Sequence, residues 1–288
     1  MPASRHSPTL RRRRLSAELR ALREAAGMTS VEATRRLEWS GGRLTKMERG
    51  EWVRPNPRDI RDLCDLYGVT DERQREYLVT LAKQGRERGW WHAYKNMLSE
   101  EYTTYIGLEA GAATVYVVDL VVIPGLLQTK DYARAVTLGG PAEVTAEQTQ
   151  RRVDIRTERQ KLIMREDDPL RLWVVMDEAA LRRMVGGGDV MREQLNNICH
   201  LAELAKVTVQ VIPFQAGAHA AVAGAFSILQ FPEPEDPDAV YVETPAGELF
   251  VEVPEEVDRF HTAYNRLQAA ALAPSASIRM IAEYAATI

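Results

Sequence analysis

The sequence predicts two domains of different fold class: an all-α domain of five helices over residues 1–85, and an α+β domain with one mixed sheet over residues 86–288. A length of 288 residues suggests about two domains. Apolar residues recur at helical spacing in the first part, whereas β-branched runs alternate with helical patterns in the second. The sign of the net charge changes close to the predicted domain boundary. Residues 1–90 hold 20 Lys and Arg against 13 Asp and Glu, a net charge of +7, while residues 91–288 hold 17 against 28, a net charge of −11.

This charge division indicates that only the N-terminal part meets a polyanion such as nucleic acid. The two cysteines, Cys64 and Cys199, lie inside helical patterns and far apart, which favours buried thiols in a reducing compartment over a disulfide. No apolar run approaches the roughly 20 residues of a membrane span, and residues 1–8 lack the apolar core of a secretory signal. We therefore expect a cytoplasmic protein without membrane contact.

Two short helices with a tight turn between them are predicted from Gly27 to Gly50. Gly27 can end the preceding helix in a left-handed conformation. Thr29 then provides an N-cap hydroxyl, and Glu32 lies three residues later, as a capping box requires. The apolar face of this helix is predicted to consist of Val31, Ala33, Thr34 and Leu37.

The second helix is predicted to begin at the N-cap Ser40 and to end at Gly50, with Leu44 and Met47 facing inward at a spacing of three. A small, polar and basic surface remains on its outward face, formed by Gly41, Gly42, Arg43, Thr45, Lys46 and Arg49. A short helix with such a surface is what a DNA major groove admits.

This stretch resembles the helix-turn-helix of the Xre/Cro class of bacterial regulators. The matching residues are Gly27, Thr29, Glu32, Leu37, Ser40, Leu44, Thr45, Lys46, Met47, Glu48, Arg49 and Gly50. Ser30 stands where the class usually has Gln, Glu38 where the turn usually has Gly, and Gly42 where the recognition helix usually has a side chain. A generic helical hairpin with a basic face is the alternative. The resemblance implies a DNA-binding site formed by Thr29, Ser30, Ser40, Gly41, Gly42, Arg43, Thr45, Lys46, Arg49 and Arg54.

The other helices of the N-terminal domain are predicted over residues 16–26, 58–67 and 71–85, and the last is expected to face inward with Tyr77, Leu78 and Leu81. The four arginines of residues 11–14 precede the first of these, and two interpretations stay open: a disordered, solubilising start, or an arm that lies on phosphates or in a minor groove. Two prolines keep the loop after Gly50 from being helical. In that loop Arg54 is placed to touch phosphate, and Trp52 is expected to pack on the domain rather than on a nucleotide.

The polar segment of residues 85–89 is interpreted as the domain junction, and the adjacent Trp90 and Trp91 as packing residues rather than a ligand site. In the C-terminal domain, strands are predicted over residues 113–123, 170–176, 207–214, 226–231, 240–243 and 249–253. Residues 126–138 are predicted to form a turn and then a helix around Tyr132, Ala133 and Val136. Further helices are predicted over residues 143–166, 177–185, 190–205 (capped by Asp189) and 254–271, with a last one from Pro274.

The C-terminal domain also resembles that of a large actinobacterial regulator family of the WhiJ-like kind. The matching segments, in order, are residues 124–135 (Pro-Gly-Leu-Leu-Gln-Thr-x-x-Tyr-Ala-Arg-Ala), Arg156-x-x-Arg159-Gln160, residues 177–183, Gln194-Leu195, and Val211-Ile212-Pro213-Phe214 with Gly217 and His219. This resemblance implies a transcriptional regulator in developmental or antibiotic-related control, whose C-terminal domain has no established activity. It also implies a small partner protein encoded by an adjacent gene.

Enzyme chemistry is not indicated. Residues 186–188 (Gly-Gly-Gly) follow no strand and form no dinucleotide fingerprint. Adjacent Asp177 and Glu178 suit an N-cap better than an acid–base pair. Cys199-His200 lacks the spacing of a zinc site, and His219 has no partner visible in the sequence. We therefore expect neither a catalytic centre nor a bound cofactor or metal.

The hypothesis that follows is a sequence-specific regulator that binds double-stranded DNA and whose C-terminal domain binds a partner protein or ligand and mediates homodimer formation. The alternative is an antitoxin-like or scaffold protein that acts mainly by binding a small partner, with DNA binding for autoregulation. An enzyme with a DNA-binding domain is the third possibility.

Overall fold

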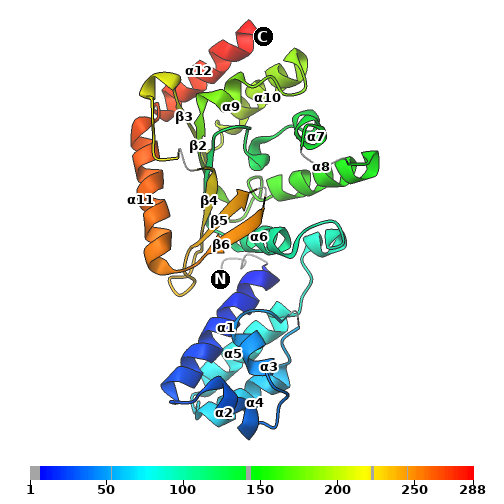
Figure 1. Ribbon diagram of the computed structural model, residues 1–288, viewed down its shortest axis with the longest axis vertical. Coiled ribbons are helices and arrows are strands. Elements are labelled where there is room, and N and C mark those ends of the chain that lie inside the picture. Colours follow the sequence, from blue (N-terminus) through cyan, green and yellow to red (C-terminus); the bar gives the residue numbers. More distant parts are fainter. Residues whose placement is uncertain (1–6, 53, 141–143, 222–223, 245) are drawn as a thin grey trace. The chain divides into compact units, whose positions relative to one another are not determined.

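The computed structural model describes residues 7–52, 54–140, 144–221, 224–244 and 246–288, and divides into two compact units (Figure 1). The N-terminal domain extends to Ala93, and the C-terminal domain starts at Tyr94. The sequence-based boundary at residue 85 coincides with the end of the fifth helix, and the 3₁₀ turn of Trp90–Tyr94 includes the boundary between the two units.

The N-terminal domain is all-α, as predicted, and its five helices enclose one apolar core. They are α1 (Pro8–Ala25), α2 (Ser30–Arg36), α3 (Arg43–Glu48), α4 (Pro57–Tyr67) and α5 (Glu72–Gly85). All five supply buried side chains to this core, among them Leu15, Leu19, Ala33, Leu44, Met47, Ile60, Leu63 and Leu78. Trp52 packs against it, as predicted, and its indole Nε1 donates to Ser16 Oγ at 2.9 Å.

The first helix starts eight residues earlier than predicted, so the arginine run lies inside it. Ser7 is the N-cap, and its Oγ accepts from Leu10 N at 3.1 Å, while Pro8 fits the first helical turn. The interpretation of residues 11–14 as a disordered start is therefore wrong, whereas contact of these arginines with phosphates or a minor groove stays a prediction. Arg12 donates to the carbonyl of Gly85 at 2.9 Å, and Arg14 pairs with Glu18 at 3.3 Å, so these arginines serve the helix and its neighbours.

Two residues predicted to face inward are exposed. Val31 is 77% exposed, because it precedes Ala33 by two positions and so lies about 200° around the helix from it. Tyr77 is 41% exposed, since the inward stripe of α5 centres on Leu78 and Ala82.

The turn between α2 and α3 differs from the prediction in its cap. Ser40 is not the N-cap of the second helix; Gly42 is, with a φ of 78°. A Cβ at Gly42 would meet nothing within 4 Å, so the left-handed backbone is what requires glycine there. Glu38 is also left-handed, with a φ of 53°. The Xre/Cro class usually has Gly at this turn position. Glu38 adopts the left-handed conformation that favours glycine, although it carries a side chain.

The C-terminal domain contains the predicted mixed sheet, with the strand order β3-β2-β1-β4-β5-β6. The pairs β1–β2 and β2–β3 are parallel, and the pairs β1–β4, β4–β5 and β5–β6 are antiparallel. The strands are β1 (Thr114–Asp119), β2 (Arg171–Asp177), β3 (Val207–Ile212), β4 (Phe226–Gln230), β5 (Ala239–Thr244) and β6 (Gly247–Val251).

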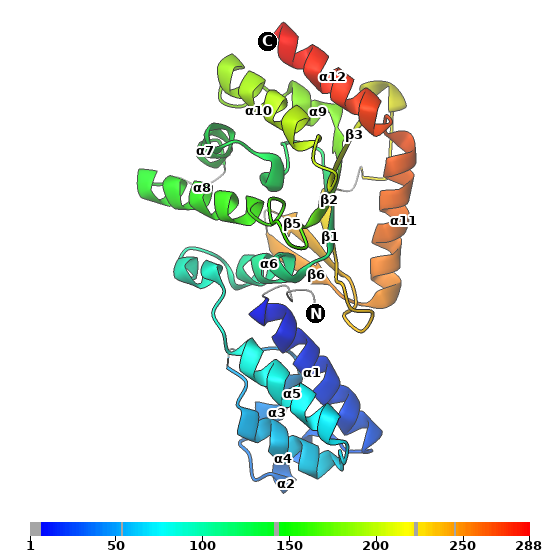
Figure 2. The ribbon, with the colours of Figure 1, turned by 180° about the vertical axis from the view of Figure 1, so that it is seen from behind.

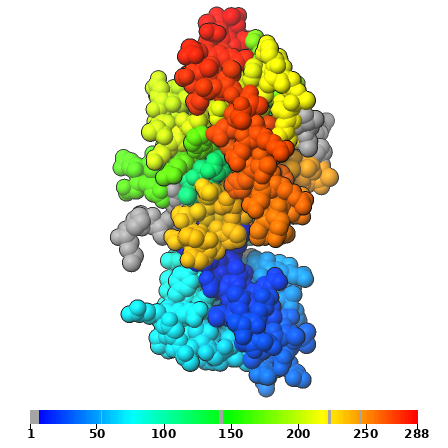
Figure 3. Space-filling view, turned by 90° about the vertical axis from the view of Figure 1, so that its left-hand side faces the viewer, coloured from blue at the N-terminus to red at the C-terminus, as the bar shows by residue number. Residues whose placement is uncertain are grey.

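Helices cover both faces of this sheet (Figures 1 and 2). They are α6 (Glu100–Gly111), α7 (Lys130–Leu138), α8 (Ala146–Gln160), α9 (Glu178–Arg182), α10 (Gly188–Leu201), α11 (Pro254–Ala270) and α12 (Pro274–Thr287). One face packs on α11 through a cluster that includes Val118, Ile228, Val240, Tyr264 and Leu267. Figure 3 shows α11 and α12, in orange and red, along that side of the domain.

Several element boundaries in this domain differ from the prediction. The helix expected over residues 143–166 is α8, which is shorter at both ends, and Glu143 lies outside the described residues. Gly187, not Asp189, occupies the N-cap position of α10. The first strand ends at Asp119, where the Oδ1 carboxylate oxygen accepts from the backbone N–H of Val121 and Val122 and turns the chain. Helix α6 was not predicted at all.

We expect Glu38→Gly to stabilise the N-terminal domain. A left-handed non-glycine residue costs about 1–2 kcal/mol, and the added chain entropy of glycine offsets about 0.5–1 kcal/mol of that relief. The net gain, about 0.5–1 kcal/mol, is measurable as slower native-state amide exchange in α2 and α3. Glu38→Ala is the control, because it removes the side chain and keeps the strain. A destabilised Glu38→Gly protein would contradict this account of the turn.

Candidate functional site

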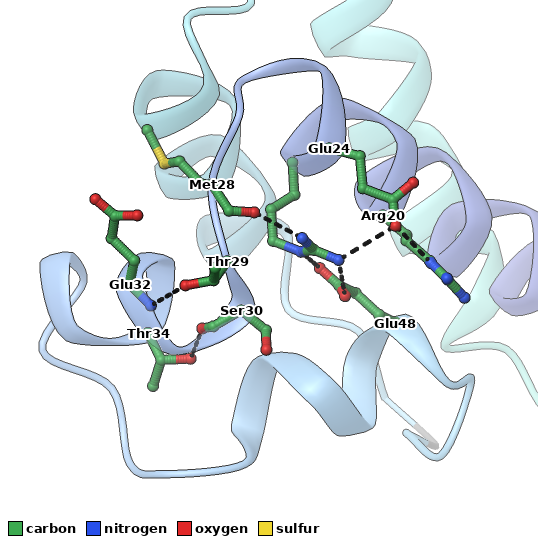
Figure 4. A network of polar contacts seen from close by, with 9 residues as sticks. Arg20, Glu24, Met28, Thr29, Ser30, Glu32, Thr34 and Glu48 are labelled. Carbon is green, nitrogen blue, oxygen red and sulfur yellow. Dashed lines mark hydrogen bonds and ion pairs between the residues drawn. The ribbon is translucent and has the colours of Figure 1, made fainter.

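A two-point ion pair fixes α3 against α1 (Figure 4). The Nε of Arg23 donates to Glu48 Oε1 at 2.7 Å, and its Nη2 donates to Oε2 at 3.0 Å. The same guanidinium donates from Nη1 to the carbonyl of Met28 at 2.7 Å, just before α2. The side chains of Arg23 and Glu48 are only 12% and 7% exposed, and the carboxylate hydrogen bond raises the pKa of Arg23. One side chain thus sets the positions of both helices of the motif.

The hydroxyl groups of Thr29 and Thr34 form hydrogen bonds with backbone groups at the start of α2. Thr29 Oγ1 accepts from Glu32 N at 3.1 Å, which confirms the predicted N-cap, and Thr34 Oγ1 donates to the carbonyl of Ser30 at 2.7 Å (Figure 4). The carboxylate of Glu32 binds Arg36 at 3.1 Å. Thr29 is exposed and Ser30 half-buried at this helix end.

The remaining residues predicted to contact DNA lie on α3 and in the loops beside it. Lys46 and Arg49 are exposed, and Arg49 Nη1 lies 3.9 Å from Glu51 Oε1. Thr45 is half-buried. The exposed residues of the flanking loops are Ser40, Gly41, Gly42 and Arg54. Leu44 and Met47 are buried beneath them, as predicted, so α3 has one apolar and one basic side.

Arg43 contacts two side chains of its own domain that the sequence did not reveal as its partners. Its Nη2 donates to Asp59 Oδ2 on α4, and its guanidinium lies 4.3 Å from the centre of the Trp39 ring. The side chain stays 41% exposed, and its contact with DNA stays a prediction. The partner Asp59 lies 16 positions along the chain, beyond what local spacing reveals.

In the C-terminal domain, side-chain amides hold the loop of residues 124–129. Gln160 Nε2 donates to the carbonyls of Gly125, at 3.1 Å, and Gln128, at 2.6 Å. Gln194 Nε2 donates to the carbonyl of Leu127 at 2.8 Å, and its Oε1 accepts from Thr129 N at 2.6 Å. Three of the segments that suggested the WhiJ-like resemblance, namely residues 124–135, 156–160 and 194–195, are therefore in direct contact.

A buried ion pair joins α6 to α8 in the same region. Arg159 donates from Nε and Nη2 to the two carboxylate oxygens of Glu109, both at 2.7 Å. The side chains are 8% and 0% exposed. The hydroxyls of Tyr102 and Tyr105 accept from Arg159 at 2.8 and 3.3 Å. Sequence reasoning missed this centre because α6 shows no clear helical stripe.

The second polar cluster lies at the ends of β2 and β3. Asp177 caps α9, as predicted, with Oδ1 accepting from Ala179 N at 2.7 Å. The structure gives His219 a partner that the sequence does not reveal: its Nε2 lies 3.2 Å from Asp177 Oδ2, and its Nδ1 accepts from Ala221 N at 3.3 Å. Both ring nitrogens are therefore occupied.

The part of the chain that the structure describes contains no group of three or more His, Cys, Asp or Glu arranged to hold a metal ion. Within the same residues, no helix is long and apolar enough to cross a membrane.

Comparison with protein families matches both domains. Residues 14–78 match a helix-turn-helix domain, and residues 102–283 match the domain of unknown function DUF5753. The second match spans more than half of the 288 residues. The chain belongs to the DUF5753 family.

The DUF5753 domain thus contains the whole sheet, α7 to α11 and most of α6 and α12, including the Arg159–Glu109 pair. The helix-turn-helix match, which suggests DNA binding, covers the Arg23–Glu48 pair and all of α2, α3 and α4. Neither the curated proteins nor the solved structures contain a match to the chain.

We expect Glu48→Gln to destabilise the helix-turn-helix unit of this DUF5753 protein by about 1.5–3 kcal/mol, the range for a hydrogen bond to a charged group. Exchange of α3 amides measures the loss. Glu24→Gln is the matched control, because Glu24 also lies near Arg23, at 3.6 Å, but is 54% exposed. Equal effects of the two substitutions would show that the Arg23–Glu48 pair does not hold α3.

Proposed function

We propose that the protein is a sequence-specific DNA-binding transcriptional regulator whose C-terminal domain binds a partner protein or ligand and mediates self-association. The helix-turn-helix match supports the DNA-binding part. The observation that supports it best is the fixed orientation of α3. With Glu48 bound to Arg23 and Leu44 buried, Lys46 and Arg49 face solvent from a short helix, as a groove-binding helix requires.

Several finer features of this proposal follow from the two resemblances. The N-terminal domain is assigned to the Xre/Cro class, and the C-terminal domain to the actinobacterial WhiJ-like kind. A small protein encoded by an adjacent gene is then a candidate partner. We propose that the protein acts by binding and not by catalysis, in the cytoplasm.

Lys46→Ala tests the assignment of α3 to the groove. Binding sites are first selected from random duplex DNA with the full-length protein, and affinity is then titrated across several salt concentrations. We expect weaker binding and a salt slope smaller by about one, because one phosphate contact is lost. Lys83→Ala removes the same charge from α5 and serves as the control. If both variants bind like the wild type, α3 does not contact DNA.

The proposed dimer follows from the small number of base contacts. Gly41 and Gly42 offer no side chains for readout, so one domain reads few bases. Two domains on half-sites about one helical turn apart would supply the missing specificity. We expect the full-length protein to sediment at twice its chain mass at micromolar concentration, and the selected DNA sites to contain a two-fold repeat. A monomeric protein that selects a single half-site would contradict the dimer.

A further inference from the structure

A cavity of about 260 Å³ lies on the sheet face that α6 and α8 cover, at the carboxyl end of β1. A second hollow of about 220 Å³ shares Tyr102, Arg156 and Glu243 with it. The volume is below the roughly 300–1,000 Å³ of pockets for drug-sized ligands, so any occupant is small.

The strand register explains why polar groups gather in the 260 Å³ cavity. Val117 on β1 pairs with Ser227 on β4, and Ser227 pairs with Tyr241 on β5, so these three side chains stand side by side on one face. Two residues further along their strands, Asp119 and Glu243 point to the same face. All five residues line the cavity.

The helices above the sheet supply the positive charge. Arg156 and Arg159 are three residues apart on α8 and share one face. Arg159 is neutralised by Glu109. Within the described residues, Arg156 forms no ion pair, and its one hydrogen bond is a 3.4 Å contact from Nη1 to Thr137 Oγ1. Burial lowers the pKa of Arg156, as expected for a desolvated cation without a carboxylate partner.

Two residues that line the cavity each carry a buried side-chain atom that lacks a hydrogen-bond partner among the described residues. These atoms are Oε1 of Gln128 and the hydroxyl of Tyr241, and each of these two residues is 5% exposed. The other end of Gln128 is fixed, because its Nε2 donates to the carbonyl of Ile123 at 2.7 Å. An unsatisfied buried polar group costs about 1–3 kcal/mol, so two at one cavity indicate an occupant that hydrogen-bonds to them.

The charges around the cavity restrict what that occupant is. A ligand with only a negative charge would bind Arg156 but face the carboxylates of Asp119 and Glu243. A ligand with only a positive charge would bind those carboxylates but leave the guanidinium group of Arg156 without an anionic partner. The carboxylate of Asp119 accepts from backbone N–H groups but forms no salt bridge among the described residues, and burial raises its pKa.

We propose that this cavity binds a small zwitterion, a free amino acid or a close derivative. Its carboxylate pairs with Arg156, and its ammonium group donates to Gln128 Oε1 and to Asp119, with the Tyr241 hydroxyl as a further partner. The role of such a molecule as an effector rests on the proposed regulatory function, but its binding does not depend on DNA.

The test uses the full-length protein and the twenty proteinogenic L-amino acids, one at a time, at millimolar concentration. Thermal shift identifies binders, and calorimetry measures their affinities. Each binder is compared with its decarboxylated amine and its deaminated acid. We expect at least one amino acid to bind, and both of its single-charge analogues to bind at least about tenfold more weakly, because each lacks one charged hydrogen bond.

Two tyrosine substitutions separate a ligand contact from a structural role. Tyr241 and Tyr264 both have a buried hydroxyl without a partner among the described residues, but Tyr264 packs on the opposite sheet face. Tyr241→Phe should weaken amino-acid binding about fivefold without lowering the melting temperature of the free protein, whereas Tyr264→Phe should bind as the wild type does.

Arg156→Gln should weaken binding about tenfold or more, while Arg151→Gln, on the exposed side of α8, should not change it. The proposal is overturned if no amino acid binds, if the deaminated acid binds as well as its amino acid, or if Tyr241→Phe binds like Tyr264→Phe. Because affinity for DNA is measured separately, failure of the amino-acid site and failure of DNA binding are distinguishable.

Discussion

The buried ion pair between Arg159 and Glu109 is the constraint on which the C-terminal domain depends. Removing two charges from water is costly, and the pair is favourable only because the guanidinium binds both carboxylate oxygens and two tyrosine hydroxyls as well. Those bonds fix α6 relative to α8 on one face of the sheet. The pair also neutralises Arg159, one of the two α8 arginines that line the cavity, and leaves Arg156 as the cation of the cavity.

The N-terminal domain uses the same chemistry for a different purpose. Arg23 binds Glu48 in a two-point geometry and also binds the carbonyl that precedes α2. In both domains an arginine with a planar fork of donors joins elements that are distant in sequence. In the N-terminal domain the pair orients α3, whose exposed side is basic; in the C-terminal domain it leaves a hollow with unsatisfied polar atoms.

The sequence predicted the features that depend on periodicity and local capping. Leu44 and Met47 share a face of α3 because of helical spacing, the Thr29 cap follows from its hydroxyl, and the mixed sheet follows from the β-branched runs. Features that depend on distant partners were missed. The pairs Arg43–Asp59 and His219–Asp177 join residues 16 and 42 positions apart, and no local pattern reveals them.

Two other prediction errors, at residues 11–14 and at helix α6, arose because local sequence patterns indicated the wrong structure. Arginines 11–14 resemble a disordered basic start, but Ser7 and Pro8 begin a helix ahead of them. Helix α6 is buried on most sides, with Tyr105 to Gly111 all buried, so it lacks the alternation of apolar and polar faces by which an amphipathic helix is recognised.

The most direct test of this account is a double-mutant cycle on the Arg159–Glu109 pair, with Arg159→Met, Glu109→Leu and both together in the full-length protein. The free energy of unfolding of the C-terminal domain is measured by native-state amide exchange in the strands. We expect each single substitution to cost about 3–5 kcal/mol, because it leaves one buried charge unpaired, and the double substitution to cost less than either. Additive losses, or single losses below about 1 kcal/mol, would show that the pair does not hold the two helices together.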